Sequence, residues 1–367
     1  MSELTFNNVT KIKVFGIGGA GCNAVNRMVE DGVAGADFYV ANTDLQVIRT
    51  SKVENKILLG ANTTHGLGCG GNPDIGRQAA LENEAEIREA VKDTDMVFIT
   101  AGMGGGTGTG AAPVFAKCAQ ESGALTIGVV TKPFAFEGRR RMMQALDGLD
   151  ELRKHVDSII IIPNNKVKEI LGDIPFKDSF KEADNILRQA VQTITDLVSF
   201  QAIINLDFAD IKSVMSNQGI ALIGIGMDDG PDRAVEAARK AVSSPLLEAD
   251  ISGARNAIIN ITGGNDLTIN DANAAVDYIR NAAGGDIDAI FGVAFNENLN
   301  NTIIVTVIAT GFEEASLEEQ QVISTPKVEV PKQTFQTEQP KQPKQPSQPV
   351  ETPVSAPLDT DFFARRR

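Results

Sequence analysis

The sequence predicts an α/β protein whose N-terminal half is a doubly wound parallel sheet. Between Lys11 and Asn164, apolar runs alternate with helical patterns, as they do where each strand is followed by a crossover helix. Some runs, such as the isoleucines of 159–162, indicate strands buried on both faces. Two glycine-rich segments, 16–21 and 104–110, each directly follow a run. Because open parallel sheets bind ligands at the carboxyl ends of their strands, we expect the ligand site at that edge.

Each element of this half is placed by its own pattern. Strands are expected where apolar and β-branched residues cluster, and helices where apolar residues recur every three to four positions. The expected strands are 11–17, 37–41, 56–59, 95–101, 124–131 and 157–163. The expected helices are 22–31, 74–91, 111–122 and 138–153.

A long helix and a second unit follow. Apolar residues keep helical spacing over 178–204, which at 1.5 Å per residue makes a connecting strut of roughly 35–40 Å. The second unit, about 206–311, mixes both element types and is expected to be α+β. Its strands are expected at 220–226, 257–262, 289–295 and 302–310, and its helices at 231–242 and 270–282. Because only 296–301 separates the last two strands, they are expected to form a hairpin.

The C-terminal segment has a different composition. Residues 316–357 are rich in Gln, Pro and Lys, and such a stretch buries too little apolar surface to fold, so it is expected to be a disordered linker. The final ten residues, 358–367, contain Phe362, Phe363 and Arg365–Arg367. Two phenylalanines at the end of a polar tether indicate a partner-binding peptide, with a frayed terminus as the alternative.

Composition narrows the function classes. The net charge of −14 argues against binding nucleic acid or lying on anionic lipid. No apolar run reaches the ~18 residues of a membrane span and the N-terminus lacks a signal-peptide pattern, so a cytoplasmic location is expected. The three cysteines have no zinc-site spacing, and two histidines leave little material for Ser-His or Cys-His catalysis.

The first glycine segment is open to two interpretations. Gly16, Gly18 and Gly21 fit the G-x-G-x-x-G fingerprint, and Asp37 or Asp44 is placed to bind a ribose. An NAD(P)-dependent oxidoreductase therefore remains an alternative. No G-x-x-x-x-G-K-[ST] segment exists, which excludes the P-loop class.

The second glycine segment, 104–110, favours a triphosphate. It offers a run of backbone N–H donors together with the hydroxyls of Thr107 and Thr109. A dinucleotide site leaves this segment without a role, whereas two phosphate cradles suit a nucleoside triphosphate.

Polar residues at other strand ends complete the expected pocket. Asn42 and Asp44 follow the second strand and offer oxygens toward a hydrated Mg²⁺ ion. Glu137 is placed to accept from ribose hydroxyls, and Arg141 brings positive charge toward the phosphates. An ordinary surface ion pair is the alternative for Glu137 and Arg141.

These segments carry a resemblance that extends over the whole chain. The Gly-Gly-Gly-Thr-Gly-Thr-Gly run at 104–110 resembles the signature of the tubulin/FtsZ superfamily. The Pro-Phe-x-Phe-Glu-Gly segment at 133–138, Asn-Leu-Asp-Phe-Ala-Asp at 205–210, the linker and the terminal peptide are similar to the FtsZ branch. The resemblance implies a GTP site with phosphate contacts at 19–23 and 106–108, and guanine contacts at Phe180 and Asp184. Phe180 is also consistent with core packing.

The loops and the resemblance together predict one set of nucleotide-binding residues. Ala20 and Cys22 depart from the glycine or asparagine of many relatives, but both are small and leave their backbone N–H groups free. The predicted set is Gly18, Gly19, Ala20, Gly21, Cys22, Asn23, Asn42, Asp44, Gly70, Gly71, Gly104, Gly105, Gly106, Thr107, Gly108, Glu137, Arg141, Asn164, Phe180 and Asp184.

The expected catalytic carboxylates lie far from this set. Asp207 and Asp210 follow the long helix and therefore stand roughly 35 Å from the nucleotide of their own chain. They can serve the nucleotide of the next subunit if chains stack head to tail, a contact that generates a filament. The resemblance implies the same role for the loop that contains Asn205, Asp207 and Asp210. Helix capping and solvated loop charges are the alternative.

The predicted function is that of a cytoskeletal GTPase. It binds GTP and GDP with Mg²⁺, forms head-to-tail protofilaments with itself, and assembles the cytoplasmic mid-cell ring of the division septum. The resemblance implies that 358–367 binds membrane anchors and division regulators, without membrane insertion or nucleic-acid binding. A tubulin-like regulator that only binds nucleotide is a further alternative. The predicted parts are an arm (1–10), a GTP-binding domain (11–175), a connecting helix (176–204), a GTPase-activating domain (205–315), the linker (316–357) and the peptide (358–367).

Overall fold

The computed structural model describes residues 10–171, 175–199, 207–244, 246–247, 251–285, 287–296 and 299–312. Asn205, the predicted linker 316–357, the predicted peptide 358–367 and nearly all of the N-terminal arm lie outside the described residues. The described strands form one ten-stranded sheet in the order β3-β2-β1-β4-β5-β6-β7-β10-β8-β9.

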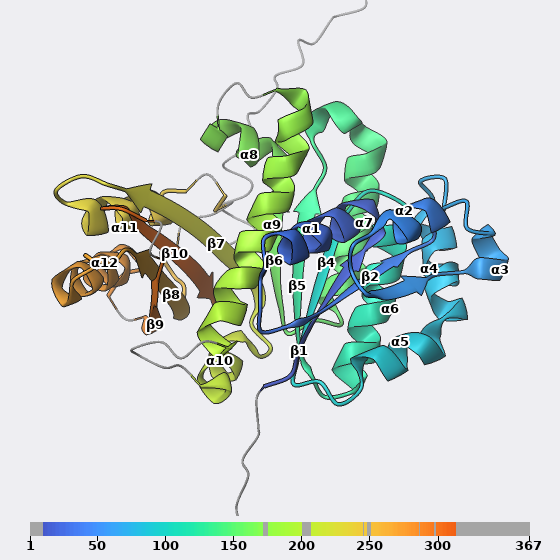
Figure 1. Cartoon of the computed structure of the whole chain (residues 1–367), viewed down its shortest axis with the longest axis horizontal. Coiled ribbons are helices and arrows are strands. Elements are labelled where there is room, and N and C mark those ends of the chain that lie inside the picture. The colour runs from blue at the N-terminus through green and yellow to red at the C-terminus, as the bar shows by residue number, and fades with distance from the viewer. Residues whose placement is uncertain are drawn as a thin grey trace, which may run out of the picture. The chain divides into compact units, whose positions relative to one another are not determined.

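The predicted doubly wound parallel sheet is confirmed in the first six strands (Figure 1). All neighbours among them are parallel, and the strand order reverses between β1 and β4, which lie side by side. The strands are β1 (Ile12–Ile17), β2 (Asp37–Asn42), β3 (Asn55–Leu58), β4 (Met96–Gly102), β5 (Leu125–Lys132) and β6 (Ser158–Pro163).

Helices cover both faces of this sheet. Residues of α1 and α9 share one apolar core, and residues of α4 to α7 share the core on the other face. The helices of this half are α1 (Gly18–Glu30), α2 (Leu45–Thr50), α3 (Ala61–Thr64), α4 (Pro73–Glu82), α5 (Glu84–Val91), α6 (Thr107–Glu121), α7 (Arg139–Arg153), α8 (Asn164–Leu171) and the long α9 (Phe176–Ser199), with a 3-10 turn at Ala135–Glu137.

Three helix predictions need correction. The expected helix 74–91 is divided at Asn83. The backbone of Asn83 leaves the helical conformation, and its side-chain oxygen accepts the Gly60 backbone N–H at 2.8 Å. Helices α1 and α6 each begin four residues before the expected start. The glycine segments therefore supply the first turns of these helices, where backbone N–H groups have no helical partner.

The second half continues the same sheet. β7 (Gly219–Asp228) pairs in parallel with β6 and antiparallel with β10 (Ile303–Thr310), and β10 pairs antiparallel with β8 (Asn256–Gly263). β8 pairs in parallel with the edge strand β9 (Asp288–Phe295). The helices α11 (Arg233–Val242) and α12 (Ile269–Ala282) pack on one face, and α10 (Phe208–Met215) precedes β7.

The predicted hairpin of the last two strands is wrong. β10 is buried at seven of its eight positions, whereas β9 is buried at two. A strand that is apolar on both faces is most stable inside the sheet, so β10 lies between β7 and β8. The connection needs only to pass over β8, because neighbouring strands lie about 4.8 Å apart.

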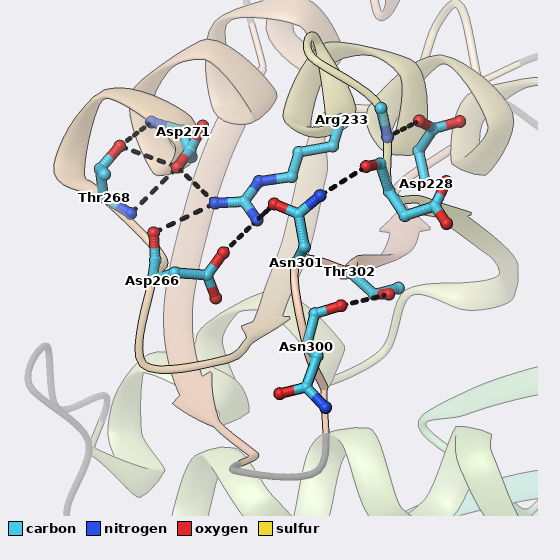
Figure 2. Close-up of polar contacts among 10 residues, drawn as sticks. Asp228, Arg233, Asp266, Thr268, Asp271, Asn300, Asn301 and Thr302 are labelled. Atoms are coloured by element: carbon cyan, nitrogen blue, oxygen red, sulfur yellow. Dashed lines mark hydrogen bonds and ion pairs between the residues drawn. The ribbon is translucent and has the colours of Figure 1, made fainter.

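Arg233 ties the loops of this second half together (Figure 2). Its guanidinium, in a residue only 9% exposed, pairs with the Asp266 carboxylate and donates to Asn301 Oδ1 at 2.8 Å and to the Asp266 carbonyl at 3.1 Å. A second ion pair reaches Asp271 at 3.5 Å. One buried cation thus fixes the starts of α11 and α12 and the approach to β10.

Candidate nucleotide-binding site

The two glycine segments lie against each other at the carboxyl ends of β1 and β4, which are neighbours in the sheet. A Cβ atom placed on Gly18 would lie 2.7 Å from the backbone N of Gly108. A Cβ on Gly102 would lie 2.7 Å from Cβ of Ala20. Only glycine permits this approach, so the starts of α1 and α6 present their N–H groups side by side.

The first segment has a buried side and an open side. A Cβ on Gly21 would collide with the Thr100 carbonyl oxygen at 2.3 Å, whereas a Cβ on Gly19 would meet no atom within 4 Å. Cys22 is turned into the core, where its thiol contacts the Gly16 carbonyl oxygen at 3.4 Å and burial raises its pKa to about 12. Its side chain is therefore unsuited to ligand binding, and only its backbone faces the loop. Asn23 is exposed.

The second segment is held by its own threonines. Gly104, at φ 93°, donates its N–H to Thr109 Oγ1 at 2.8 Å, so this hydroxyl braces the loop instead of facing a phosphate as expected. Thr107 Oγ1 lies 2.7 Å from Thr43 Oγ1 and 3.4 Å from Cys69 Sγ. These contacts join the segment to the loops after β2 and β3.

Arg141 and Glu137 border the second segment. A Cβ on Gly105 would lie 3.9 Å from Nη2 of Arg141, and a Cβ on Gly104 would lie 2.6 Å from its carbonyl oxygen. Glu137 accepts the Phe134 N–H through Oε1 at 2.9 Å and pairs with Arg141 through Oε2. The ion pair that was the alternative interpretation is present, and it places a half-exposed guanidinium beside the glycine backbone.

A second group of residues lies where β6, α1 and α9 meet. Asn164 is 6% exposed and its buried Oδ1 has no hydrogen-bond partner in the described structure. Asp184 on α9 lies 3.4 Å from Nε of Arg27 on α1. Burial raises the pKa of Asp184 to about 7, although Arg27 acts to lower it. An unsatisfied amide and a buried acid at a functional edge indicate a polar ligand.

Phe180 belongs to an aromatic cluster beside this group. Its ring is 5.2 Å from that of Phe134 and 6.4 Å from that of Phe136, both edge to face. Phe180 keeps 39% of its surface exposed, so a face of the cluster remains accessible to a planar base.

The remaining predicted residues lie at the end of β2 and in the segments that follow β2 and β3. Asn42 is buried and accepts the Asp44 N–H at 3.2 Å, and Asp44 caps α2 by accepting the Gln46 N–H at 2.8 Å. Gly70 and Gly71 are exposed. Gly71 is fixed by Gln144, which donates to its carbonyl oxygen at 3.4 Å.

Asp207 and Asp210 form a reciprocal cap at the start of α10. Asp207 Oδ1 accepts the Asp210 N–H at 2.9 Å, and Asp210 Oδ2 accepts the Asp207 N–H at 3.1 Å. The capping alternative is thus realised in this chain. Figure 1 shows α10 at the opposite end of α9 from α8, which follows β6 directly. The structure does not bring these acids to the glycine segments of their own chain.

Sequence reasoning missed Arg27 and Thr43. Thr43 stands between two predicted residues, Asn42 and Asp44, at a strand end, and this position was an available signal. Arg27 had no such signal, because its role depends on how α1 packs against α9.

Comparisons with known proteins agree with this geometry. Residues 11–172 match the GTPase domain of the Tubulin/FtsZ family, and residues 219–313 match the C-terminal domain of the FtsZ family. A structure titled as an empty FtsZ dimer from M. jannaschii is 46% identical, with a TM-score of 0.80, covering 82% of this chain and 88% of that chain. A GTPγS-bound CetZ2 protofilament from Haloferax volcanii is 20% identical, with a TM-score of 0.72 and coverages of 86% and 97%, and shares the fold.

The two domain matches and the 46% identity place the protein in one class, the tubulin-like GTPases. Within that class the chain belongs to the FtsZ family. Neither match supports the dehydrogenase alternative. The fold is accordingly that of the Tubulin/FtsZ GTPases, and a solved FtsZ relative is titled as a dimer.

Proposed function

We propose that this chain binds GTP across its two abutting glycine segments, polymerises head to tail, and hydrolyses GTP at the contact between subunits. The observation that carries the proposal is the separation of two half-sites. The glycine segments lie at the carboxyl ends of β1 and β4. Asp207 and Asp210 lie beyond the C-terminal end of α9, a 24-residue helix that spans roughly 36 Å by helical rise.

Each part of the nucleotide has a matching group. The N–H groups of residues 18–23 and 105–108 hold phosphate oxygens at two helix starts, Arg141 adds positive charge, and Gly70 and Gly71 close the rim. Glu137 accepts from the ribose. Asp184 accepts hydrogen bonds from guanine N1–H and N2–H₂. The buried Oδ1 of Asn164 finds its missing hydrogen-bond partner on the base, and Phe180 packs against the ring.

Mg²⁺ fits this arrangement as an ion held mainly by phosphates and water. No group of three or more His, Cys, Asp or Glu in the described residues is placed to hold a metal. Mg²⁺ keeps several waters and commonly takes few protein ligands, so Asn42 and Asp44 suffice to orient its waters. The ion would neutralise charge on the phosphates.

Hydrolysis requires a group that orients the attacking water. In the proposed filament, Asp207 and Asp210 of one subunit face the γ-phosphate of the next, and Asn205, two residues before Asp207 in the sequence, acts with them. The capping geometry supports this role because it fixes both carboxylates at an exposed helix start. Solved relatives that are a dimer and a protofilament support self-association.

A complementation experiment tests the shared site. Asp210→Asn keeps the reciprocal cap, because an amide oxygen at this third helical position can still accept the Asp207 N–H, but removes the carboxylate. Gly19→Asp places a negative charge on the open side of the phosphate loop, where a side chain meets no atom within 4 Å. Each variant alone should lose GTP turnover at least tenfold. An equimolar mixture should recover turnover, because Asp210 of the Gly19 variant completes the intact GTP site of the other.

Gly19→Ala is the matched control and should polymerise and hydrolyse GTP as the wild type does. A mixture no more active than the sum of its two components would refute the shared site. So would full turnover by Asp210→Asn.

We place this filament in the cytoplasmic division ring at mid-cell, with 358–367 as its docking peptide for membrane anchors and regulators. No described helix is long and apolar enough to cross a membrane. Truncation after Pro357 should therefore spare filament formation in solution and abolish recruitment to a membrane that carries the anchor. Recruitment of the truncated chain would contradict this role.

A further inference from the structure

The outer edge of β9 is open in the described part of the chain. β9 ends the sheet, spans eight residues and contains no lysine or proline. The opposite edge, β3, is protected: it spans only four residues and carries Lys56. Proteins usually blunt exposed edges in this way, so the unblunted β9 indicates an edge that receives a strand.

Backbone direction along β9 identifies the groups available for pairing. The N–H groups of Asp288 and Asn296 both point to the β8 side, since they donate to the Arg255 and Gly263 carbonyl oxygens at 3.0 and 2.9 Å. The register between β8 and β9 is continuous from 288 to 295, so the period of two holds throughout. The N–H and C=O groups of the odd-numbered residues 289–295 therefore face the open edge.

An apolar pocket of about 220 Å³ lies beside the same edge. Phe291, Val293 and Phe295 of β9 line it together with Ile269, which is 81% exposed at the start of α12. The loop that forms its far wall is fixed by the Arg233 contacts to Asp266 and Asp271 (Figure 2). A wall that is already ordered lowers the entropy cost of binding.

We infer that β9 pairs antiparallel with β9 of a second copy of this chain, about a two-fold axis at Gly292. This register pairs 289 with 295 and 291 with 293, so all outward groups meet and about eight hydrogen bonds form. Phe295 faces Ala289, and Phe291 faces Val293 beside the pocket, which are compatible cross-strand sizes. Asp288 faces Asn296 instead of another acid, so no like charges are opposed.

An isologous contact requires a surface that is complementary to itself. The β9 register meets this requirement, so a second copy of the chain is favoured over a foreign peptide. One strand pair is a small contact beside the ~1,200–2,000 Å² of a stable dimer, and a chain of net charge −14 repels its copy. The contact becomes strong when it repeats along two filaments. The inference thus rests on the proposed assembly and adds lateral pairing of filaments to it.

Two matched variants test the pairing in assembled full-length protein. Ala289→Pro removes one outward N–H at an edge position that tolerates proline, and Ala289→Ser keeps it. Both should form filaments and hydrolyse GTP at wild-type rates. Low-speed pelleting of paired filaments, measured with GTP at 0.3 M salt, should fall at least fivefold for Ala289→Pro only. Equal pelleting of both variants would overturn the inference, as would wild-type filaments that remain single.

Disulfide trapping tests the register without filaments. Residues 290 and 294 face each other across the pair at a Cα separation of about 4.5 Å, within disulfide range. The native cysteines are all buried. An oxidised mixture of Ile290→Cys and Ala294→Cys should yield a covalent dimer, and either variant alone should not. Absence of the mixed dimer would refute the strand pairing, whereas absence of GTP-driven filaments would refute only the proposed assembly.

Discussion

Asp184→Asn should stabilise the nucleotide-free protein at pH 8. The pKa of Asp184 is raised from 3.8 to about 7 by burial, against the effect of Arg27. Between these values the folded chain holds a proton that the unfolded chain releases. The stability from this group is therefore full below pH 3.8 and is lost as the pH rises through 7. At 1.36 kcal/mol per unit the loss is at most about 4 kcal/mol, and structural relaxation reduces it.

The same substitution should weaken guanine nucleotide binding. The ionised carboxylate accepts two guanine N–H groups, whereas the Asn amide offers one acceptor and a donor in the wrong place. We expect at least a hundredfold loss of GDP affinity at pH 8. Wild-type affinity should fall about tenfold from pH 8 to pH 6, since the ionised fraction falls accordingly. Thermal melting without nucleotide and calorimetric GDP titration at pH 6, 7 and 8 measure both effects.

Asp196 on the same helix supplies the control. Burial raises its pKa to about 6, against a hydrogen bond from Gln192. Asp196→Asn should also raise the melting temperature at pH 8, but leave GDP affinity unchanged. Two results would refute the reasoning: an Asp184→Asn protein that melts below the wild type at pH 8, or one that binds GDP as tightly as the wild type.

Two further substitutions test the loop and the buried cation. Gly21→Ala drives Cβ into the Thr100 carbonyl oxygen and should cost about 1–3 kcal/mol of unfolding free energy in denaturant titration, whereas Gly19→Ala should cost almost nothing. Arg233→Met leaves Asp266 and Asp271 without their cation and should cost about 1–3 kcal/mol, measured the same way, with GDP affinity retained. A neutral Gly21→Ala would contradict the close packing of the loop, and an unchanged Arg233→Met melt would contradict the clamp.

Local patterns were sufficient for most of the fold. The central parallel strands β4, β5 and β6 are buried at nearly every position, so their existence is readable from residues such as those of 159–162 alone. The arrangement of the last two strands was not readable in this way. Adjacency in sequence suggested a hairpin, but the burial of β10 on both faces placed it inside the sheet. Strand order there depends on which faces other elements cover, and this information is non-local.

The same distinction between local and non-local information applies to the residues of the site. The glycine segments could be predicted because close backbone approach demands glycine at the sequence positions themselves. The electrostatics of Asp184 could not, because they arise from α9 packing on α1 and from Arg27 at 3.4 Å. An ionisable group kept buried at a cost to stability, together with a buried Asn164 oxygen without a hydrogen-bond partner, is hard to explain by folding alone. Both features are relieved by one ligand that donates to the acid and contacts the amide. A guanine base has this pattern of groups.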